Sequence, residues 1–123
     1  NDFGETCLKL DTGASAYARL DWFNPAASRT WGDGRTFAMG TKGYIEIRKN
    51  IDVAHEGANK IYLVNDTEEA EIDCTGKVGF PYFGKLILDI LNGTENAMTQ
   101  EHAFKAAEIS LEAQRIAEAA QVS

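Results

Sequence analysis

Several features that would narrow the function of this protein are scarce in its sequence. Two cysteines in 123 residues are too few for a disulfide framework or a cysteine-based metal site. Cys7 and Cys74 both lie in strand-like runs, so we interpret them as reduced packing residues, which favours the cytoplasm. No apolar run approaches the roughly 20 residues that cross a bilayer, and residues 1–6 carry no targeting signal. These absences predict a soluble protein.

Basic residues are also in the minority. Twelve lysines and arginines face 19 acidic residues, which gives a net charge of -7. Such a field repels nucleic-acid phosphates and anionic membrane surfaces, so we expect neither as a partner. With 44% hydrophobic residues in a chain of this length, we expect residues 1–123 to form a single domain with one core.

Alternating apolar residues predict strands in the first part of the chain. Mostly short connections separate these segments, which makes consecutive strands antiparallel neighbours. The pattern predicts one open, mainly antiparallel sheet of about six strands. Its expected strands are residues 6–10, 14–22, 36–39, 44–48, 60–64 and 69–74.

The apolar period becomes helical after residue 80. Residues 82–92 carry apolar side chains at helical spacing, Pro81 suits the first helical position, and Gly93 suits a left-handed cap. Thr99 is expected to cap a second, longer helix with a small apolar stripe and a charged opposite side. Strands followed by helices predict an α+β fold, with the two C-terminal helices on one face of the sheet.

The segment Leu10–Ser15 reads LDTGAS and contains the Asp-Thr-Gly letters of aspartic proteases. Its simpler interpretation is a tight hairpin turn in which Gly13 takes a positive φ. The alternative is a small dimeric aspartic protease in which Asp11 of Asp11-Thr12-Gly13 activates water. The second element of that family is an apolar pair followed by glycine, and the nearest match, residues 77–79, begins with a lysine.

Other candidate catalytic residues are few. His55 follows Asp52 in a loop and could act as a base or a ligand, but we interpret it as a solvated side chain. His102 falls in the first turn of the last helix and needs no catalytic role. Residues 32–35, Gly-Asp-Gly-Arg, are read as a turn because no helix follows them to present its amides to a phosphate. We therefore predict no catalytic, cofactor-binding or metal-binding residue in this chain.

The longest predicted loop, residues 24–35, holds the residues we consider adjacent to a substrate. Trp31, Asp33 and Arg35 combine one aromatic ring with two opposite charges, a set that can contact a polyhydroxylated ligand. The alternative is that Asp33 and Arg35 pair to close the loop beneath a packed indole.

Tyrosine and arginine are frequent on the polar sides of the predicted strands. Both residues are enriched where proteins meet, because each joins a broad apolar body to a polar tip. We therefore predict that this sheet face forms a homo-oligomer by two-fold pairing; the alternative is a solvated face with ordinary cross-strand pairs. The predicted oligomer face consists of Tyr17, Arg19, Tyr44, Glu46, Arg48 and Tyr62.

Three segments together resemble the C-terminal domain of the Gfo/Idh/MocA oxidoreductases, the glucose-fructose oxidoreductase and inositol dehydrogenase family. Residues 37–48 are similar to a strand, Gly-Thr-x-Gly, strand element of that family. Residues 82–93 look like its penultimate helix and the following glycine, and residues 99–117 look like its closing helix. The segments occur in the family's order and span nearly the whole chain.

The resemblance implies a longer parent enzyme. In the family, an N-terminal Rossmann domain binds NAD or NADP, and the parent passes hydride to or from a sugar or polyol. The chain has no Gly-x-Gly-x-x-Gly, no Glu-Lys-Pro and no Asp-x-x-x-His, so the resemblance implies that this part alone binds no dinucleotide and is inactive. Because Asp52 and His55 have a different spacing, the family's catalytic role is not carried over to them. The missing Rossmann domain is then an expected partner.

Overall fold

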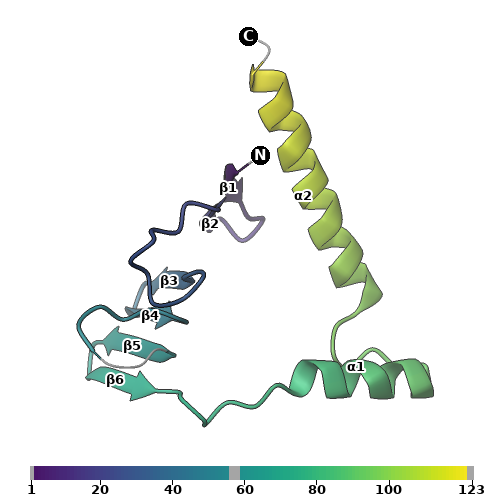
Figure 1. The fold of residues 1–123 in the computed structure, drawn as a ribbon. Helices are drawn as coiled ribbons and strands as arrows, with labels where there is room; N and C mark the ends of the chain where they lie inside the picture. Colours follow the sequence, from purple (N-terminus) through teal and green to yellow (C-terminus); the bar gives the residue numbers. More distant parts are fainter. Residues whose placement is uncertain (1, 56–58, 122–123) are drawn as a thin grey trace. The chain divides into compact units, whose positions relative to one another are not determined.

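A computed structural model describes residues 2–55 and 59–121. The fold is α+β, with six antiparallel strands followed by two helices (Figure 1). The chain divides into two compact units, Asn1–Val78 with the strands and Gly79–Ser123 with the helices.

The first two strands form a hairpin. β1 (Phe3–Lys9) pairs with β2 (Ser15–Asp21) along its full length. The connecting turn is closed by hydrogen bonds from the Leu10 amide to the Ala14 carbonyl and from the Gly13 amide to the Leu10 carbonyl, both 2.9 Å. Gly13 has φ 85°, in the region that favours glycine. The prediction of a hairpin turn at Asp11-Thr12-Gly13 is confirmed.

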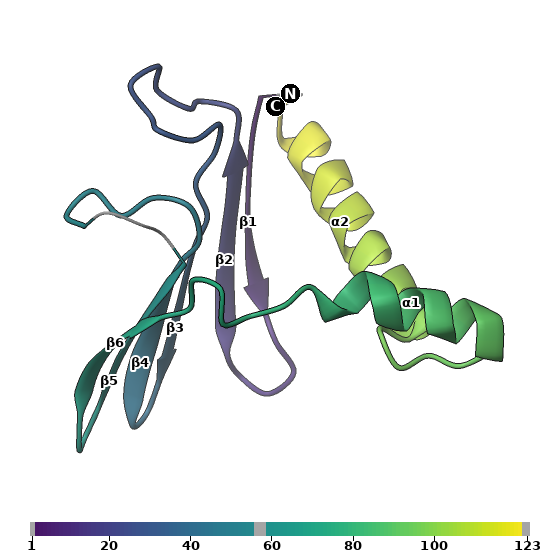
Figure 2. The ribbon, with the colours of Figure 1, turned by 60° about the horizontal axis from the view of Figure 1, so that its bottom comes forward.

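The other four strands form a second sheet in the order β3-β4-β5-β6 (Figure 2). They are β3 (Arg35–Gly40), β4 (Gly43–Arg48), β5 (Lys60–Asn65) and β6 (Glu69–Asp73). The turn into β4 depends on Gly43, whose φ is 148°. A Cβ atom at this position would collide with the carbonyl oxygen of Val64 on the neighbouring strand. Only glycine fits this approach.

The predicted single sheet of about six strands is wrong, because β2 and β3 are not paired and the strands form sheets of two and four. The segment between them, residues 22–34, forms hydrogen bonds within itself. Asn24 Nδ2 and Ser28 Oγ both donate to the carbonyl of Thr30, each at 2.9 Å. A segment that folds on itself in this way does not bring the two strands together in one ladder.

The pairing register divides the side chains of the four-stranded sheet between two faces, because residues opposite each other point to the same side. One side, which we call the polar face, carries Arg35, Phe37, Met39, Tyr44, Glu46, Arg48, Lys60, Tyr62, Val64, Glu69, Glu71 and Asp73. The opposite side, the apolar face, carries Thr36, Ala38, Ile45, Ile47, Ile61, Leu63, Ala70 and Ile72.

Both predicted helices are confirmed. α1 (Pro81–Asn92) has proline in its first turn and ends at Gly93, which is left-handed with φ 65°. α2 (Gln100–Gln121) begins after Thr99, whose Oγ1 accepts a 3.2 Å hydrogen bond from the amide of His102. None of the described helices is long and apolar enough to span a membrane. That the helices cover one face of a sheet stays a prediction.

The described residues bury no apolar side chain, whereas the composition led us to expect one core. The buried residues among them are polar: Asp52, Lys60 and Asp89. Large side chains such as Leu20 and Trp22 are 76% and 65% exposed.

Candidate functional site

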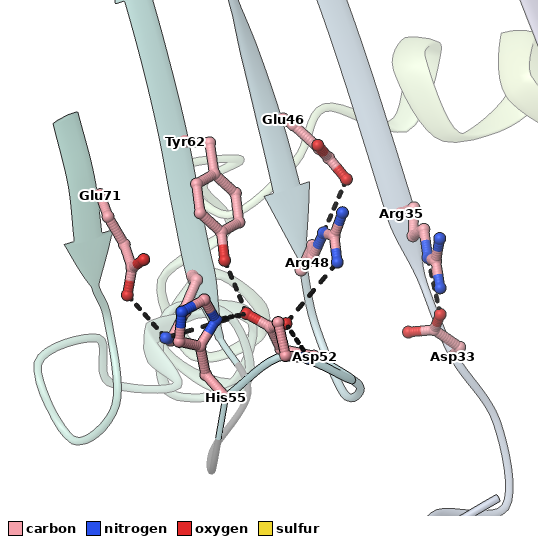
Figure 3. A network of polar contacts seen from close by, with 10 residues as sticks. Asp33, Arg35, Glu46, Arg48, Asp52, His55, Tyr62 and Glu71 are labelled. Carbon is pink, nitrogen blue, oxygen red and sulfur yellow. Dashed lines mark hydrogen bonds and ion pairs between the residues drawn. The ribbon is translucent and has the colours of Figure 1, made fainter. Parts of the chain in front are cut away.

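A cluster of polar side chains lies on the polar face of the four-stranded sheet, around the carboxylate of Asp52 (Figure 3). Asp52 follows β4, and its side chain is only 1% exposed. The hydroxyl of Tyr62 donates to Oδ2 at 2.6 Å, and the amide of Ala54 donates to Oδ1 at 3.1 Å. A buried carboxylate needs such donors, because an unpaired charge away from water is costly.

Two cations flank this carboxylate. Lys60 Nζ lies 3.8 Å from Asp52 Oδ2 and 2.6 Å from Glu71 Oε1, so it joins the loop to β6. Arg48 Nη1 lies 3.7 Å from Asp52 Oδ1, and its Nε donates to Glu46 Oε1 at 2.7 Å. These contacts tie three strands and the loop between β4 and β5 to one buried acid.

The register of β4 and β5 explains why an acid is placed there. Arg48 and Lys60 are direct cross-strand partners, and like charges in that relation destabilise a sheet. Asp52 lies within 4 Å of both cations and compensates their charge. The Arg48 guanidinium also lies 5.5 Å from the ring centroid of Tyr62, a cation–π distance.

Hydrogen bonding sets the protonation states of the cluster. The hydrogen bonds from Tyr62 and His55 hold the pKa of Asp52 well below its usual value, and they outweigh burial, which acts in the opposite direction. Donation to Asp52 raises the pKa of Tyr62. The hydrogen bond to Glu71 raises the pKa of Lys60. The acid is therefore ionised, while the phenol and the amine keep their protons.

His55 is closer to this cluster than the sequence suggested. Its Nδ1 lies 2.9 Å from Asp52 Oδ2, while its side chain stays 48% exposed. The interpretation as a solvated loop residue therefore misses one contact, an acid–histidine pair. Sequence reasoning also missed Asp52 as a buried acid. The available signal was its position four residues after Arg48, on a loop that returns to Lys60.

The residues predicted to adjoin a substrate lie in two different settings. Asp33 and Arg35 pair at 2.8 Å, and both line an open cavity of about 470 Å³. Trp31 is 77% exposed, does not line that cavity, and contacts the Trp22 ring edge-on with centroids 5.1 Å apart. The Asp33–Arg35 pair is the one that the loop-closing alternative expects, but an indole that is 77% exposed is not the packed indole of that alternative. A substrate role for these residues stays a prediction.

The residues of the predicted oligomer face do not share one sheet. Tyr17 and Arg19 lie on β2 of the hairpin, where Tyr17 donates to Glu5 at 2.8 Å and Arg19 to Asp21 at 2.9 Å. The other four members lie together on the polar face of the four-stranded sheet: Tyr44, Glu46, Arg48 and Tyr62. The expectation of one continuous face is corrected accordingly, because the hairpin and the larger sheet are not hydrogen-bonded to each other.

The remaining candidate motifs form no further site. Asp11 lies in the exposed hairpin turn and His102 in the exposed first turn of α2. Cys7 is exposed, Cys74 is half-buried, and neither forms a disulfide. Across residues 2–55 and 59–121, no group of three histidine, cysteine or acidic side chains could hold a metal ion.

Comparison with known proteins identifies a structural relative. No protein-family model matches the chain, and no curated protein matches it. A crystal structure from Erwinia carotovora atroseptica, described as a "putative oxidoreductase", superposes with a TM-score of 0.87 at 46% sequence identity. The match covers 93% of this chain and 34% of that one, so the chain spans about a third of that protein's length. The chain therefore has an oxidoreductase-related fold.

Proposed function

We propose that the chain is the C-terminal sheet domain of an NAD(P)-dependent oxidoreductase of the Gfo/Idh/MocA type, which acts on a sugar or polyol. The observation that carries the proposal is the structural match described above. The chain is 46% identical to about one third of a protein that is described as a "putative oxidoreductase". This match agrees with the order of the three segments that resemble the family, residues 37–48, 82–93 and 99–117. The same match favours this function over the aspartic protease.

In this proposal the domain has a scaffold role: it holds the copies of the enzyme together and forms one side of the substrate site. The catalytic residues lie in another part of the enzyme. The exposed apolar side chains of the strands and helices supply the surface that a Rossmann domain and a second copy would cover. The aromatic, arginine and acidic residues of the polar face suit a two-fold contact between copies. NAD or NADP would belong to the Rossmann domain.

The gene upstream of residue 1 offers the most direct test. A reading frame that continues upstream into a glycine-rich nucleotide-binding fold is expected, followed by the family's Glu-Lys-Pro segment. A reading frame that encodes only the 123 residues would contradict the proposal.

A hydride-transfer assay gives an independent test. The chain by itself is expected to leave NADH and NADPH fluorescence unchanged and to show no turnover with a panel of sugars and polyols. Cofactor reduction by the chain alone would contradict the scaffold role. Cleavage of a peptide, lost in Asp11→Asn, would support the protease instead.

A further inference from the structure

The open cavity beside the loop of residues 22–34 has one charge that the structure leaves uncompensated. Arg19, Arg35, Arg48 and Arg115 each pair with a carboxylate within 4 Å. Arg29 lines the cavity and has no such partner among residues 2–55 and 59–121. A guanidinium in that state is a ready donor to a carboxylate or phosphate group.

The acids of the same cavity do not cancel this charge. Asp33 accepts from Arg35 Nε at 2.8 Å and from the Gly34 amide at 2.9 Å. Asp52 is held by Tyr62 and lies within 4 Å of two cations. Arg29 therefore supplies the positive charge that is open to a ligand.

The other polar lining residues offer acceptors more than donors. Ser28 Oγ donates to the Thr30 carbonyl, which leaves its lone pairs to accept. Asn24 Nδ2 donates to the same carbonyl, so its Oδ1 stays available as an acceptor. Acceptors of this kind suit ligand hydroxyl groups, while Ile51 and Val53 form an apolar wall for carbon atoms. The volume of about 470 Å³ lies in the range of small-molecule sites.

We propose that this cavity binds a small hydroxylated ligand that carries one anionic group, a carboxylate or a phosphate, with Arg29 as the contact to that group. The inference deepens the proposed substrate-side role and rests on it for the use of the ligand. Every contact named for the ligand comes from residues 24–53, so binding can be measured on the 123-residue chain without a cofactor.

The test is an amide NMR titration of the chain with gluconate, glucose 6-phosphate, glucose and inorganic phosphate. Gluconate or glucose 6-phosphate is expected to shift the amides of residues 24–35 and 51–53 and to bind roughly tenfold or more tighter than glucose, because the contact to Arg29 is charge-assisted. The tighter of the two identifies the anionic group. Inorganic phosphate is expected to bind more weakly than the hydroxylated anion.

Arg29→Gln is expected to reduce the affinity for the anion to that for glucose. Lys42→Gln removes the same charge from the exposed turn between β3 and β4 and is expected to have no such effect. Equal binding of glucose and the anions, shifts outside the cavity, or equal losses in both variants would overturn the proposal. If inorganic phosphate binds as tightly as glucose 6-phosphate, the hydroxyl groups contribute nothing to binding, and the proposal of a hydroxylated ligand is overturned.

A failed titration and a failed function are distinguishable. If the chain binds the anion but its gene encodes no nucleotide-binding fold, the proposed ligand site stands and the proposed dehydrogenase parent is contradicted. If the gene encodes that fold but the cavity binds none of the probes, the proposed function stands and the proposed ligand site is overturned.

Discussion

The four-stranded sheet and the β1–β2 hairpin are both antiparallel, yet they differ in what holds them. In the larger sheet, Asp52 and Lys60 are buried, and their contacts reach residues 10 and 11 positions away on other strands. In the hairpin, every residue of β2 is exposed, and the side-chain contacts from Arg19 to Asp21 and from Tyr17 to Glu5 on β1 lie at the exposed surface. The larger sheet therefore contains a buried polar anchor, whereas the side-chain contacts of the hairpin are exposed.

The turns of the two sheets also differ, in how closely other atoms surround the turn glycine. Gly43 lies against the backbone of Val64 and Asn65, whereas a Cβ at Gly13 would meet no atom within 4 Å. Both glycines have positive φ, but only the first is confined by a neighbouring strand. Substitutions at matched positions can therefore test the difference between the two sheets.

The largest effect is expected for Gly43→Ala. The new Cβ would collide with the carbonyl of Val64, so we expect a loss of about 3 kcal/mol in the free energy of unfolding. Urea denaturation followed by far-UV circular dichroism measures it. A loss below that of Gly13→Ala would show that the close approach does not exist.

The next effect concerns the buried acid. In Asp52→Asn an amide replaces one carboxylate oxygen and the charge is lost, so hydrogen exchange at the Ala54 amide should rise roughly tenfold or more. Asp21→Asn is the matched control, because Asp21 accepts from the Phe23 amide in the same way but is more exposed. Equal acceleration in both variants would contradict a special anchor at Asp52.

Acid should weaken the larger sheet through the same group. Because the folded-state pKa of Asp52 is depressed, its contribution is complete above the unfolded value of about 3.9 and is lost as the pH falls below it. His55, Tyr62, Lys60 and Arg48 face this carboxylate. Amide spectra of β4 and β5 during an acid titration should show the loss.

The Asp52→Asn variant provides the control for that titration. It is expected to be less stable at neutral pH and to show a shallower loss of β4 and β5 signals in acid. If the variant and the parent chain lose the β4 and β5 signals at the same pH, the loss in acid is due to titratable groups other than Asp52. Asp89 also has a depressed pKa, but it reports on the helical unit.

The smallest effect is expected for Gly13→Ala. An alanine in the left-handed region costs about 1 kcal/mol, and no neighbouring atom adds to that strain. The change in the urea midpoint of the hairpin, followed by the amide signals of β1 and β2, measures it. A loss as large as that of Gly43→Ala would remove the contrast between the turns.

Local patterns predicted the elements well. The alternation of apolar residues located all six strands, and the proline, glycine and threonine signals at residues 81, 93 and 99 located both helices. The division into two sheets was not predictable in the same way. A two-residue period shows which side a residue faces, but not which strand lies beside it.

The polar cluster was missed for a related reason. Asp52, Tyr62 and Glu71 lie far apart in the sequence, and only the register of β4, β5 and β6 brings their partners together. The Asp33–Arg35 pair, in contrast, was open to sequence reasoning because its members are two residues apart.

The oligomeric state tests the scaffold role most directly. Sedimentation equilibrium of the 123-residue chain should give at least twice the 13.5 kDa monomer mass, and Tyr44→Glu combined with Arg48→Glu on the polar face should return it to the monomer. Tyr17→Glu combined with Arg19→Glu on the hairpin makes a matched comparison. A monomer at high protein concentration, with a mass unchanged by either pair of substitutions, would contradict the account.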